Sequence, residues 1–349
     1  MTNRVARLVL HIGQHKTGST ALQKCLARNR AELGREGILY PRLGPLNHAH
    51  HALVPALVGL RPVALDIRER LGTDPLGRSA QLYDELRQML DRTAVHTVVL
   101  SSEVLFNRLE PQEMVQMAAR LSDIAERIEI VCYLRHPADY LLSVLSSQVL
   151  RTPTLRMPNE SWQVLVVESY AHAPKFTISV TPYSDKSVPD GDVIKDFAER
   201  VLQTGVSLRR AGGSGESNQA LSAEAMCLAQ EFARRVRASR DVSMSLSHRL
   251  FRKLARPMDK RIAGYRRPAL RPGLAEEVVR YTKGLRRLRD DWGCVFPGLD
   301  YDAAGTGSRV EFGALTEVGD FCRYDEARLR RLRLYFGWLL PNGRRSASF

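Results

Sequence analysis

A polar segment near the N-terminus combines residue types that bind anions. It reads His-Ile-Gly-Gln-His-Lys-Thr-Gly-Ser-Thr and follows a short apolar run. Gly13 and Gly18 allow the backbone to wrap tightly around a bound group, and Lys16 adds a mobile positive charge. A helix beginning at Ser19 would turn its free N–H groups and the positive end of its dipole toward the same group, beside the hydroxyls of Ser19 and Thr20. The pattern therefore predicts an anion site. The alternative is a glycine turn capped by a hydroxyl residue.

The segment differs from the loop GxxxxGK[ST] that binds nucleoside triphosphates. Lys16 and Thr17 reproduce its last two positions, but His15 and Leu10 stand where that loop has glycines. The loop before the lysine must therefore be shorter and differently shaped, which disfavours a Walker-type site.

A carboxylate is placed to accept a proton near this segment. Glu103 follows an apolar run at residues 97–100, in the sequence Ser-Ser-Glu. Ligands of open α/β sheets bind beyond the carboxyl ends of the strands, so Glu103 is expected on the same rim as Lys16, within reach of a substrate hydroxyl. The alternative is that Glu103 caps a helix starting at Val104, where the helix dipole favours an acid.

Histidines offer a second candidate base. His48, His50 and His51 form a cluster, in which His51 is the rival of Glu103, and His15 inside the polar segment is a third candidate. The His-x-His spacing could bind a metal, but no third ligand lies at a useful spacing, so we predict no metal site.

The elements expected to position these groups alternate between strand and helix. Short apolar runs predict buried strands of a parallel sheet at residues 5–11, 37–40, 97–100, 128–134 and 176–180. Helical spacing of apolar residues predicts helices at residues 19–33, 138–150 and 192–202 and from about residue 221. Strand then helix, repeated, is typical of a three-layer, doubly wound α/β fold with a mostly parallel sheet.

We expect one domain over residues 1–349. An α/β core would span residues 1–220, with an Arg-rich helical part at residues 221–343 packed on it. Residues 60–80 and 151–160 lack clear periodicity and are predicted as surface segments that shape a cleft.

Composition restricts the class of protein. The chain is 44% hydrophobic and 26% charged, as expected of a globular protein, and no run of eighteen apolar residues occurs. The N-terminal segment is not followed by a small-residue cleavage site of a signal peptide. The five cysteines are odd in number, lie far apart and show no CxxC spacing. We therefore expect a cytoplasmic protein with reduced thiols. The net charge of +14 predicts affinity for anions of several kinds.

Two motifs in the correct order resemble those of sulfotransferases that use 3′-phosphoadenosine 5′-phosphosulfate (PAPS). The stretch Lys-Thr-Gly-Ser-Thr is similar to the 5′-phosphosulfate loop of the family, which in bacterial members reads His-Lys-Thr-Gly-Thr-Thr and is followed by Leu-Gln, here Leu22 and Gln23. The second signature is an Arg at a strand end with a Ser eight positions later, matched by Arg135 and Ser143. The chain is most similar to the bacterial, carbohydrate-type branch, and the resemblance implies the P-loop-like sulfotransferase fold.

The resemblance assigns roles to individual residues. It implies that the 5′-phosphosulfate is held by Lys16 and the backbone amides of Thr17, Gly18, Ser19 and Thr20, with His15 also among the residues that bind the cofactor. It implies that Arg135 and Ser143 hold the 3′-phosphate, for which a bidentate Arg and a hydroxyl are suited. The Arg-Lys-Gly loop of cytosolic animal members is missing. Arg209 and Arg210 could replace it, although a helix-end cap is an equal alternative.

The expected activity follows from the resemblance. A sulfuryl group would move from PAPS to a hydroxyl of a carbohydrate, glycolipid or small molecule, and adenosine 3′,5′-bisphosphate would remain. Lys16 would stabilise the leaving phosphate, and Glu103 or His51 would act as the base. No metal is expected to take part. The positive charge is also compatible with peripheral contact to an anionic membrane. With only 7% aromatic residues, no nucleic acid is expected as partner. The alternatives are a P-loop kinase for a small molecule, which needs a magnesium ligand, and a basic module that binds anions or nucleic acid.

Overall fold

The computed structural model describes residues 4–183, 192–206, 208–209, 220–238 and 242–337, with only the backbone at 237–238 and 242–248. Arg210 lies outside the described residues. The chain forms two compact units. The first contains Met1–His136, Ser161–Gly212 and Gly284–Tyr301, and the second contains Pro137–Glu160, Gly213–Lys283 and Asp302–Phe349.

These units do not follow the predicted division at residue 220. Helix α7 (Pro137–Gln148) packs on α12 (Leu274–Tyr281) and so belongs to the second unit. Helix α13 (Leu285–Trp292) instead packs on α8 (Trp162–Ala171) in the first unit, where Arg287 forms an ion pair with Glu168. The unit to which α7 and α13 each belong depends on long-range side-chain packing, which local sequence patterns do not report.

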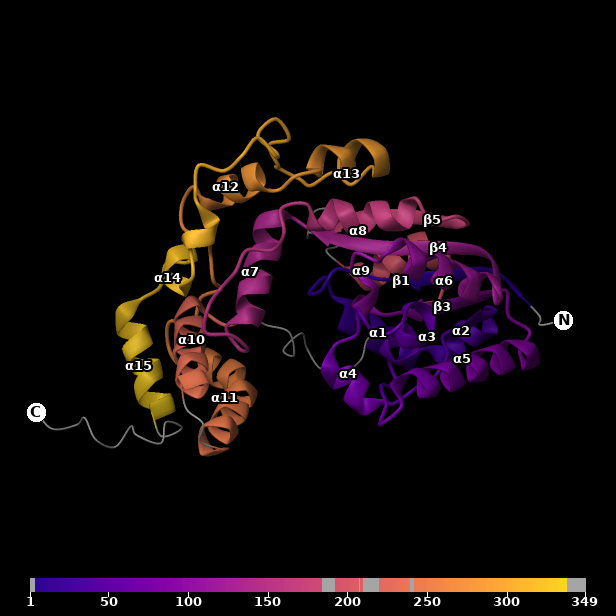
Figure 1. The fold of residues 1–349 in the computed structure, drawn as a ribbon, viewed down its shortest axis with the longest axis horizontal. Coiled ribbons are helices and arrows are strands. Elements are labelled where there is room, and N and C mark those ends of the chain that lie inside the picture. The colour runs from indigo at the N-terminus through magenta and orange to yellow at the C-terminus, as the bar shows by residue number, and fades with distance from the viewer. Residues whose placement is uncertain (1–3, 184–191, 207, 210–219, 239–241, 338–349) are drawn as a thin grey trace, which may run out of the picture. The chain divides into compact units, whose positions relative to one another are not determined.

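The first unit contains a five-stranded sheet in which all neighbouring strands are parallel (Figure 1). Its strands are β1 (Val5–His11), β2 (Ile38–Leu39), β3 (Thr97–Ser101), β4 (Ala125–Arg135) and β5 (Phe176–Tyr183). They lie in the order β2-β3-β1-β4-β5. All five predicted strands are confirmed. After β1 the chain forms β2 and β3 on one side of this strand, and then β4 and β5 on its other side. The strand β1 therefore lies at the switch point, where ligands of such sheets bind.

The helices of the first unit cover both faces of the sheet. Besides α8 and α13 they are α1 (Ser19–Arg28), α2 (Arg30–Arg35), α3 (Val54–Val58), α4 (Leu65–Arg70), α5 (Pro75–Arg92), α6 (Pro111–Ser122) and α9 (Val193–Asp196). Single turns add η1 (His51–Leu53), η2 (Glu103–Leu105) and the π-helical turn η4 (Phe197–Leu202).

Successive side chains along each strand point alternately to the two faces of the sheet, so the core has a part on each face. Val9, Val99 and Val131 pack with side chains of α1, α2, α9 and η4 in one cluster. Helices α6 and α8 contact β4 and β5, and α3 packs on α5 and α6. Since successive side chains of a strand point to opposite faces, His11 lies on the same face as Val9, at the end of β1. The predicted mixed α/β class with a parallel sheet is confirmed.

One helix prediction needs correction. The helix expected at residues 19–33 is interrupted at Asn29, whose side-chain amide donates to the Cys25 carbonyl at 2.7 Å and so competes with the backbone ladder. Residues 60–80, predicted as a surface segment without clear periodicity, contain α4 and the start of α5. Asp74 caps α5 by accepting from Gly77 N at 2.9 Å, and Pro75 supplies the first-turn residue.

The second unit is helical. Besides α7 and α12 it contains α10 (Ala223–Ala238), α11 (Val242–Arg261), α14 (Val318–Phe321), α15 (Glu326–Phe336) and the short turn η6 (Phe312–Ala314). Its core contains Arg328, only 1% exposed, which donates to Asp259 Oδ1 at 2.6 Å, Glu224 Oε2 at 2.9 Å and Ser222 Oγ at 2.6 Å. Ser222 therefore belongs to a buried cluster with Arg328 and its carboxylate partners. Along the described stretches, no helix combines the length and apolar character that crossing a membrane requires.

Candidate anion site and proton acceptors at the carboxyl end of the sheet

The loop between β1 and α1 has an unusual backbone. Gly13, Lys16 and Gly18 have φ angles of 31°, 72° and 79°. For a lysine this left-handed conformation costs about 1–2 kcal/mol. Such strain persists where the surroundings impose it, frequently at ligand sites. Helix α1 begins directly after Gly18, so its free N–H groups open onto this loop.

The loop leaves no room for a side chain at Gly13. A Cβ added there would lie 2.7 Å from His11 Nε2 and 2.8 Å from Ser19 Oγ. The end of β1 and the start of α1 therefore both turn a polar atom toward the same glycine. This close approach explains the glycine better than turn formation alone.

Thr17 holds the loop together. Its N–H and its hydroxyl both donate to the Gln14 carbonyl, at 3.3 and 2.7 Å, and its side chain is fully buried. The family resemblance assigned the backbone amide of Thr17 to the phosphosulfate. In the structure this amide is bound to the Gln14 carbonyl inside the loop. His15 and Lys16 are exposed, and Thr20 is half-buried.

Buried polar atoms without a hydrogen-bond partner gather around this loop. Within the described part of the chain they are His11 Nε2, Ser19 Oγ, Gln14 Nε2 and Arg135 Nε. An unpaired buried polar group costs about 1–3 kcal/mol, so native structures rarely retain one without reason. Four such atoms, at the ends of β1 and β4, in the loop and at the start of α1, fit a site whose hydrogen bonds are completed by a ligand. All but one are donors or hydroxyls, which suits an anion.

Arg135 is held at the end of β4 by its backbone. Its N–H donates to Gln14 Oε1 at 2.7 Å and its carbonyl accepts from Gln163 Nε2 at 2.8 Å. Its guanidinium lies over the Tyr183 ring, 5.0 Å from the centroid. Gln14 thus ties the anion loop to the strand end that carries Arg135, so the structure brings these two predicted parts together.

His11 is fully buried at the end of β1. Its Nδ1 lies 2.8 Å from Ser101 Oγ, and its ring contacts Tyr133 and Phe197 edge-on or tilted. Burial lowers the pKa of His11 to about 4, against a smaller opposing effect of Glu103, so the ring is neutral at neutral pH.

Glu103 and His51 face each other beyond the end of β3. His51 Nε2 lies 3.7 Å from Glu103 Oε2, and His51 Nδ1 lies 2.8 Å from Ser102 Oγ. Glu103 Oε2 also accepts from Gln23 Nε2 at 2.7 Å. The two predicted rival bases are therefore neighbours in one pair.

The charges of this pair are linked. Burial raises the pKa of the Glu103 carboxyl, but His51, the backbone, Gln23 and His15 together bring it below its ordinary value. Burial lowers the pKa of His51, against the opposing effect of Glu103 and Asp66. At neutral pH the arrangement is therefore a carboxylate beside a neutral imidazole, each of which can accept a proton.

The other histidines of the cluster have different surroundings. His50 is buried, accepts at Nδ1 from Ser101 N at 2.9 Å and donates from Nε2 to the Pro41 carbonyl at 3.0 Å. Both ring nitrogens are used, so His50 joins β3 to the segment after β2. Among the described residues, no three His, Cys, Asp or Glu side chains are arranged to hold a metal ion.

One predicted binding residue, Arg209, lies away from this loop, and another, Ser143, belongs to the second unit. The backbone of Arg209 is bound by Asn29 at the C-terminal end of α1, at 2.9 Å in both directions, and its exposed guanidinium lies 3.8 Å from Glu32. It is thus at the opposite end of α1 from the anion loop. Ser143 lies on α7, which belongs to the second unit, so its role in holding a 3′-phosphate stays a prediction.

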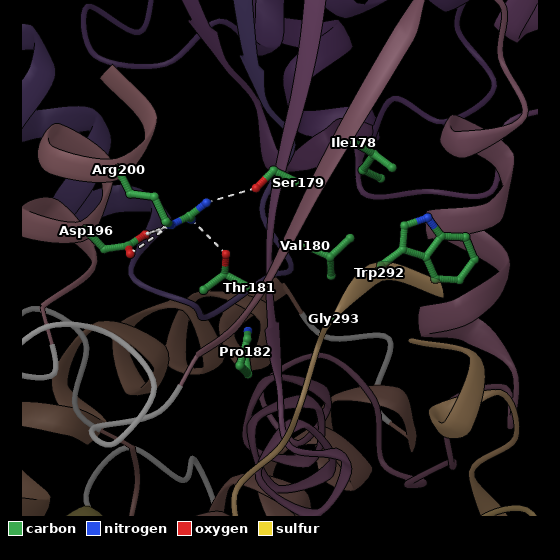
Figure 2. Close-up of a pocket in the computed structure, with 9 residues that line it drawn as sticks. All are labelled: Ile178, Ser179, Val180, Thr181, Pro182, Asp196, Arg200, Trp292 and Gly293. Atoms are coloured by element: carbon green, nitrogen blue, oxygen red, sulfur yellow. Dashed lines mark hydrogen bonds and ion pairs between the residues drawn. The ribbon is translucent and has the colours of Figure 1, made fainter. Parts of the chain in front are cut away.

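A separate pocket of about 420 Å³ lies at the edge strand β5, between Arg200 and Trp292 (Figure 2). Arg200 donates to Ser179 Oγ at 2.9 Å, Thr181 Oγ1 at 2.7 Å and Asp196 Oδ2 at 2.8 Å. Its charge is neutralised and its donors are engaged, so it joins η4 to β5 and leaves little for an anion.

Sequence patterns assigned no individual role to the buried groups His11, Gln14, Gln23 and Gln163. A signal existed for two of them. His11 ends an apolar strand directly before the glycine loop, and Gln23 lies among the apolar residues of α1. Polar residues in such positions need a partner or a function.

No family model matches the chain, and no curated protein matches it. Among solved structures, the chain is similar to the sulfotransferase domain from the curacin biosynthetic pathway, with 12% sequence identity and a TM-score of 0.26, covering 58% of this chain and 71% of that one.

Proposed function

We propose that the chain is a PAPS-dependent sulfotransferase acting on a hydroxyl acceptor. One observation carries the proposal: His11, Gln14, Ser19 and Arg135 surround a glycine-lysine loop at a helix start, and each retains a buried polar atom without a partner among the described residues. That arrangement suits an anionic ligand.

The donor would be held by two parts of the rim. Lys16, Ser19 and the start of α1 would bind the 5′-phosphosulfate, and Arg135 would bind the 3′-phosphate. The family resemblance supports the same division. The Arg135 guanidinium is already oriented by the Tyr183 ring, which reduces the entropy lost on binding.

PAPS would supply a sulfuryl group whose bond to the phosphate oxygen breaks as sulfur bonds to the acceptor oxygen, with the electron pair leaving on the 5′-phosphate. Lys16 would stabilise the charge that develops there. Glu103 would take the proton of the acceptor hydroxyl, assisted by His51 through their 3.7 Å contact. An acceptor that exposes a hydroxyl, such as a carbohydrate, glycolipid or small alcohol, is compatible with this chemistry.

Calorimetry with adenosine 3′,5′-bisphosphate, AMP and ATP plus magnesium tests the proposal. We expect the bisphosphate to bind more tightly than AMP, because only it carries the 3′-phosphate for Arg135. Arg135→Ala should weaken the bisphosphate about 10- to 100-fold, since a charge-assisted hydrogen bond contributes about 1.5–3 kcal/mol, and should leave AMP little changed.

Arg209→Ala is the matched control. Its exposed guanidinium lies at the far end of α1 near Glu32, so its loss should leave bisphosphate affinity close to that of the unmodified chain. Equal affinity for the bisphosphate and AMP would contradict the assignment of Arg135. Tight binding of ATP that requires magnesium would instead favour the kinase alternative.

A further inference from the structure

We propose that His11 donates a hydrogen bond from Nε2 to the anion bound in the loop, and that Ser101, Gln23 and Glu103 hold its ring in the required tautomer. This inference rests on the proposed function, which makes the anion the phosphosulfate of the donor, and it adds a contact that the loop motif does not contain.

The position of His11 Nε2 supports a ligand contact. The atom is fully buried and has no partner in the described ranges, and it lies 2.7 Å from where a Cβ of Gly13 would be. Ser19 Oγ, also unpartnered there, lies 2.8 Å from the same point. The two polar atoms therefore flank the inner side of the loop, beside the first turn of α1.

The tautomer follows from a chain of hydrogen bonds. Ionised Glu103 only accepts, so the Gln23 amide must present its nitrogen to Oε2, at 2.7 Å. The same nitrogen lies 3.1 Å from Ser101 Oγ and donates to it. The Ser101 hydroxyl, having accepted from Gln23, still carries its own proton, which the proposed arrangement directs to His11 Nδ1 at 2.8 Å.

A neutral imidazole carries one ring proton. With Nδ1 accepting from Ser101, that proton is on Nε2, where it points to the loop. The other tautomer would turn a lone pair toward the anion and is disfavoured there. Because the His11 ring is buried and neutral, its N–H orients the bound anion without adding net charge. Lys16 supplies the positive charge.

Nitrogen NMR of the His11 ring in the unmodified protein tests the tautomer directly. We expect a protonated Nε2 and an unprotonated Nδ1, with the Nε2 proton shifting and exchanging more slowly on addition of adenosine 3′,5′-bisphosphate. Protonation at Nδ1 in the bound state would overturn the inference. Ser101→Ala should produce a mixture of tautomers, which a merely structural serine would not.

A matched pair of variants tests the contact. His11→Gln places an amide N–H near the Nε2 position, whereas His11→Asn places its amide near Nδ1 and leaves the Nε2 position empty. We expect His11→Asn to weaken bisphosphate binding about three- to tenfold, as for one neutral hydrogen bond, and His11→Gln to weaken it less. Melting temperatures and circular dichroism establish that both variants are folded.

The two proposals fail in different ways. If the unmodified chain binds the bisphosphate and folded His11→Asn binds it equally well, the role of His11 is wrong while the sulfotransferase proposal stands. If the unmodified chain ignores the bisphosphate but binds inorganic sulfate with the same dependence on His11, the donor assignment is wrong and His11 remains an anion contact.

Discussion

Acidification should destabilise the first unit through two buried histidines. His11 and His50 are 0% and 3% exposed, and burial lowers the pKa of each to about 4 from an ordinary 6.5. In the unfolded chain both would be protonated below pH 6.5. Because the folded pKa is depressed, the stabilising effect of keeping the rings neutral is complete above pH 6.5 and is lost as the pH falls toward 4.

The size of the loss follows from these values. Between pH 7 and pH 5 the unfolded state takes up a proton at each ring that the folded state excludes, which lowers the free energy of unfolding by about 2 kcal/mol per histidine. The two together amount to about 4 kcal/mol, a large share of a typical stability of about 5–15 kcal/mol. The lowered pKa of His51 acts in the same direction.

Urea denaturation between pH 7 and pH 5 measures the effect. Trp162 and Trp292 lie in the first unit, so the fluorescence of a Trp338→Phe background reports mainly on that unit. In that background His50→Asn keeps an acceptor for Ser101 N but cannot take up a proton. We expect this variant to lose about 2 kcal/mol less than its parent over the same pH range.

His172→Gln, at the exposed end of α8, controls for the replacement of a histidine as such. The reasoning is refuted if His50→Asn and its parent lose the same free energy between pH 7 and pH 5. It is equally refuted if the parent is as stable at pH 5 as at pH 7. The readout is the change in the free energy of unfolding between pH 7 and pH 5. The stability of His50→Asn at pH 7 alone is not informative, because loss of the hydrogen bond to the Pro41 carbonyl lowers it at every pH.

Three further outcomes follow. Glu103→Gln should lower kcat about 10²- to 10⁴-fold in a sulfate-transfer assay with little change in donor affinity or Tm, whereas normal turnover together with an inactive His51→Ala would make the histidine the base. Lys16→Ala should abolish most transfer while the fold persists by circular dichroism, and the unmodified chain should stay active in EDTA; magnesium-dependent turnover would argue against sulfate transfer. Arg328→Met should destabilise the second unit by about 3–5 kcal/mol in thermal unfolding, because two buried carboxylates lose their counter-charge. Neutralising both carboxylates should restore most of that loss, and an unchanged Tm would contradict the role of the cluster.

Local sequence patterns were sufficient for the sheet and for the loop. Strands such as β1 and β3 bury both faces and therefore appear as continuous apolar runs, and a glycine-lysine segment between strand and helix has few other structures available. The prediction that Lys16, Glu103 and Arg135 follow strands whose carboxyl ends share one rim needed only strand direction.

Side-chain pairing needed the tertiary structure. Glu103 and His51 are 52 residues apart and His11 and Ser101 are 90 apart, so no local pattern reports that they meet. Gln23 joins these two pairs from α1, although its position resembles that of an apolar core residue. The sequence also grouped His50 with the candidate base His51, whereas burial and its two ring hydrogen bonds make His50 a structural link.

What the sequence by itself determined is the order of the strands along the chain, the glycine-lysine loop between strand and helix, and the residue types that chemistry would need. Those properties depend on hydrophobic period, glycine placement and charge, which act over a few residues. Only the tertiary structure decided which polar atoms are buried without a partner, that Arg209 lies at the far end of α1, and that α7 belongs to a separate unit. Burial and hydrogen bonding are set by segments distant in sequence, because each side chain's solvent exposure depends on everything packed around it.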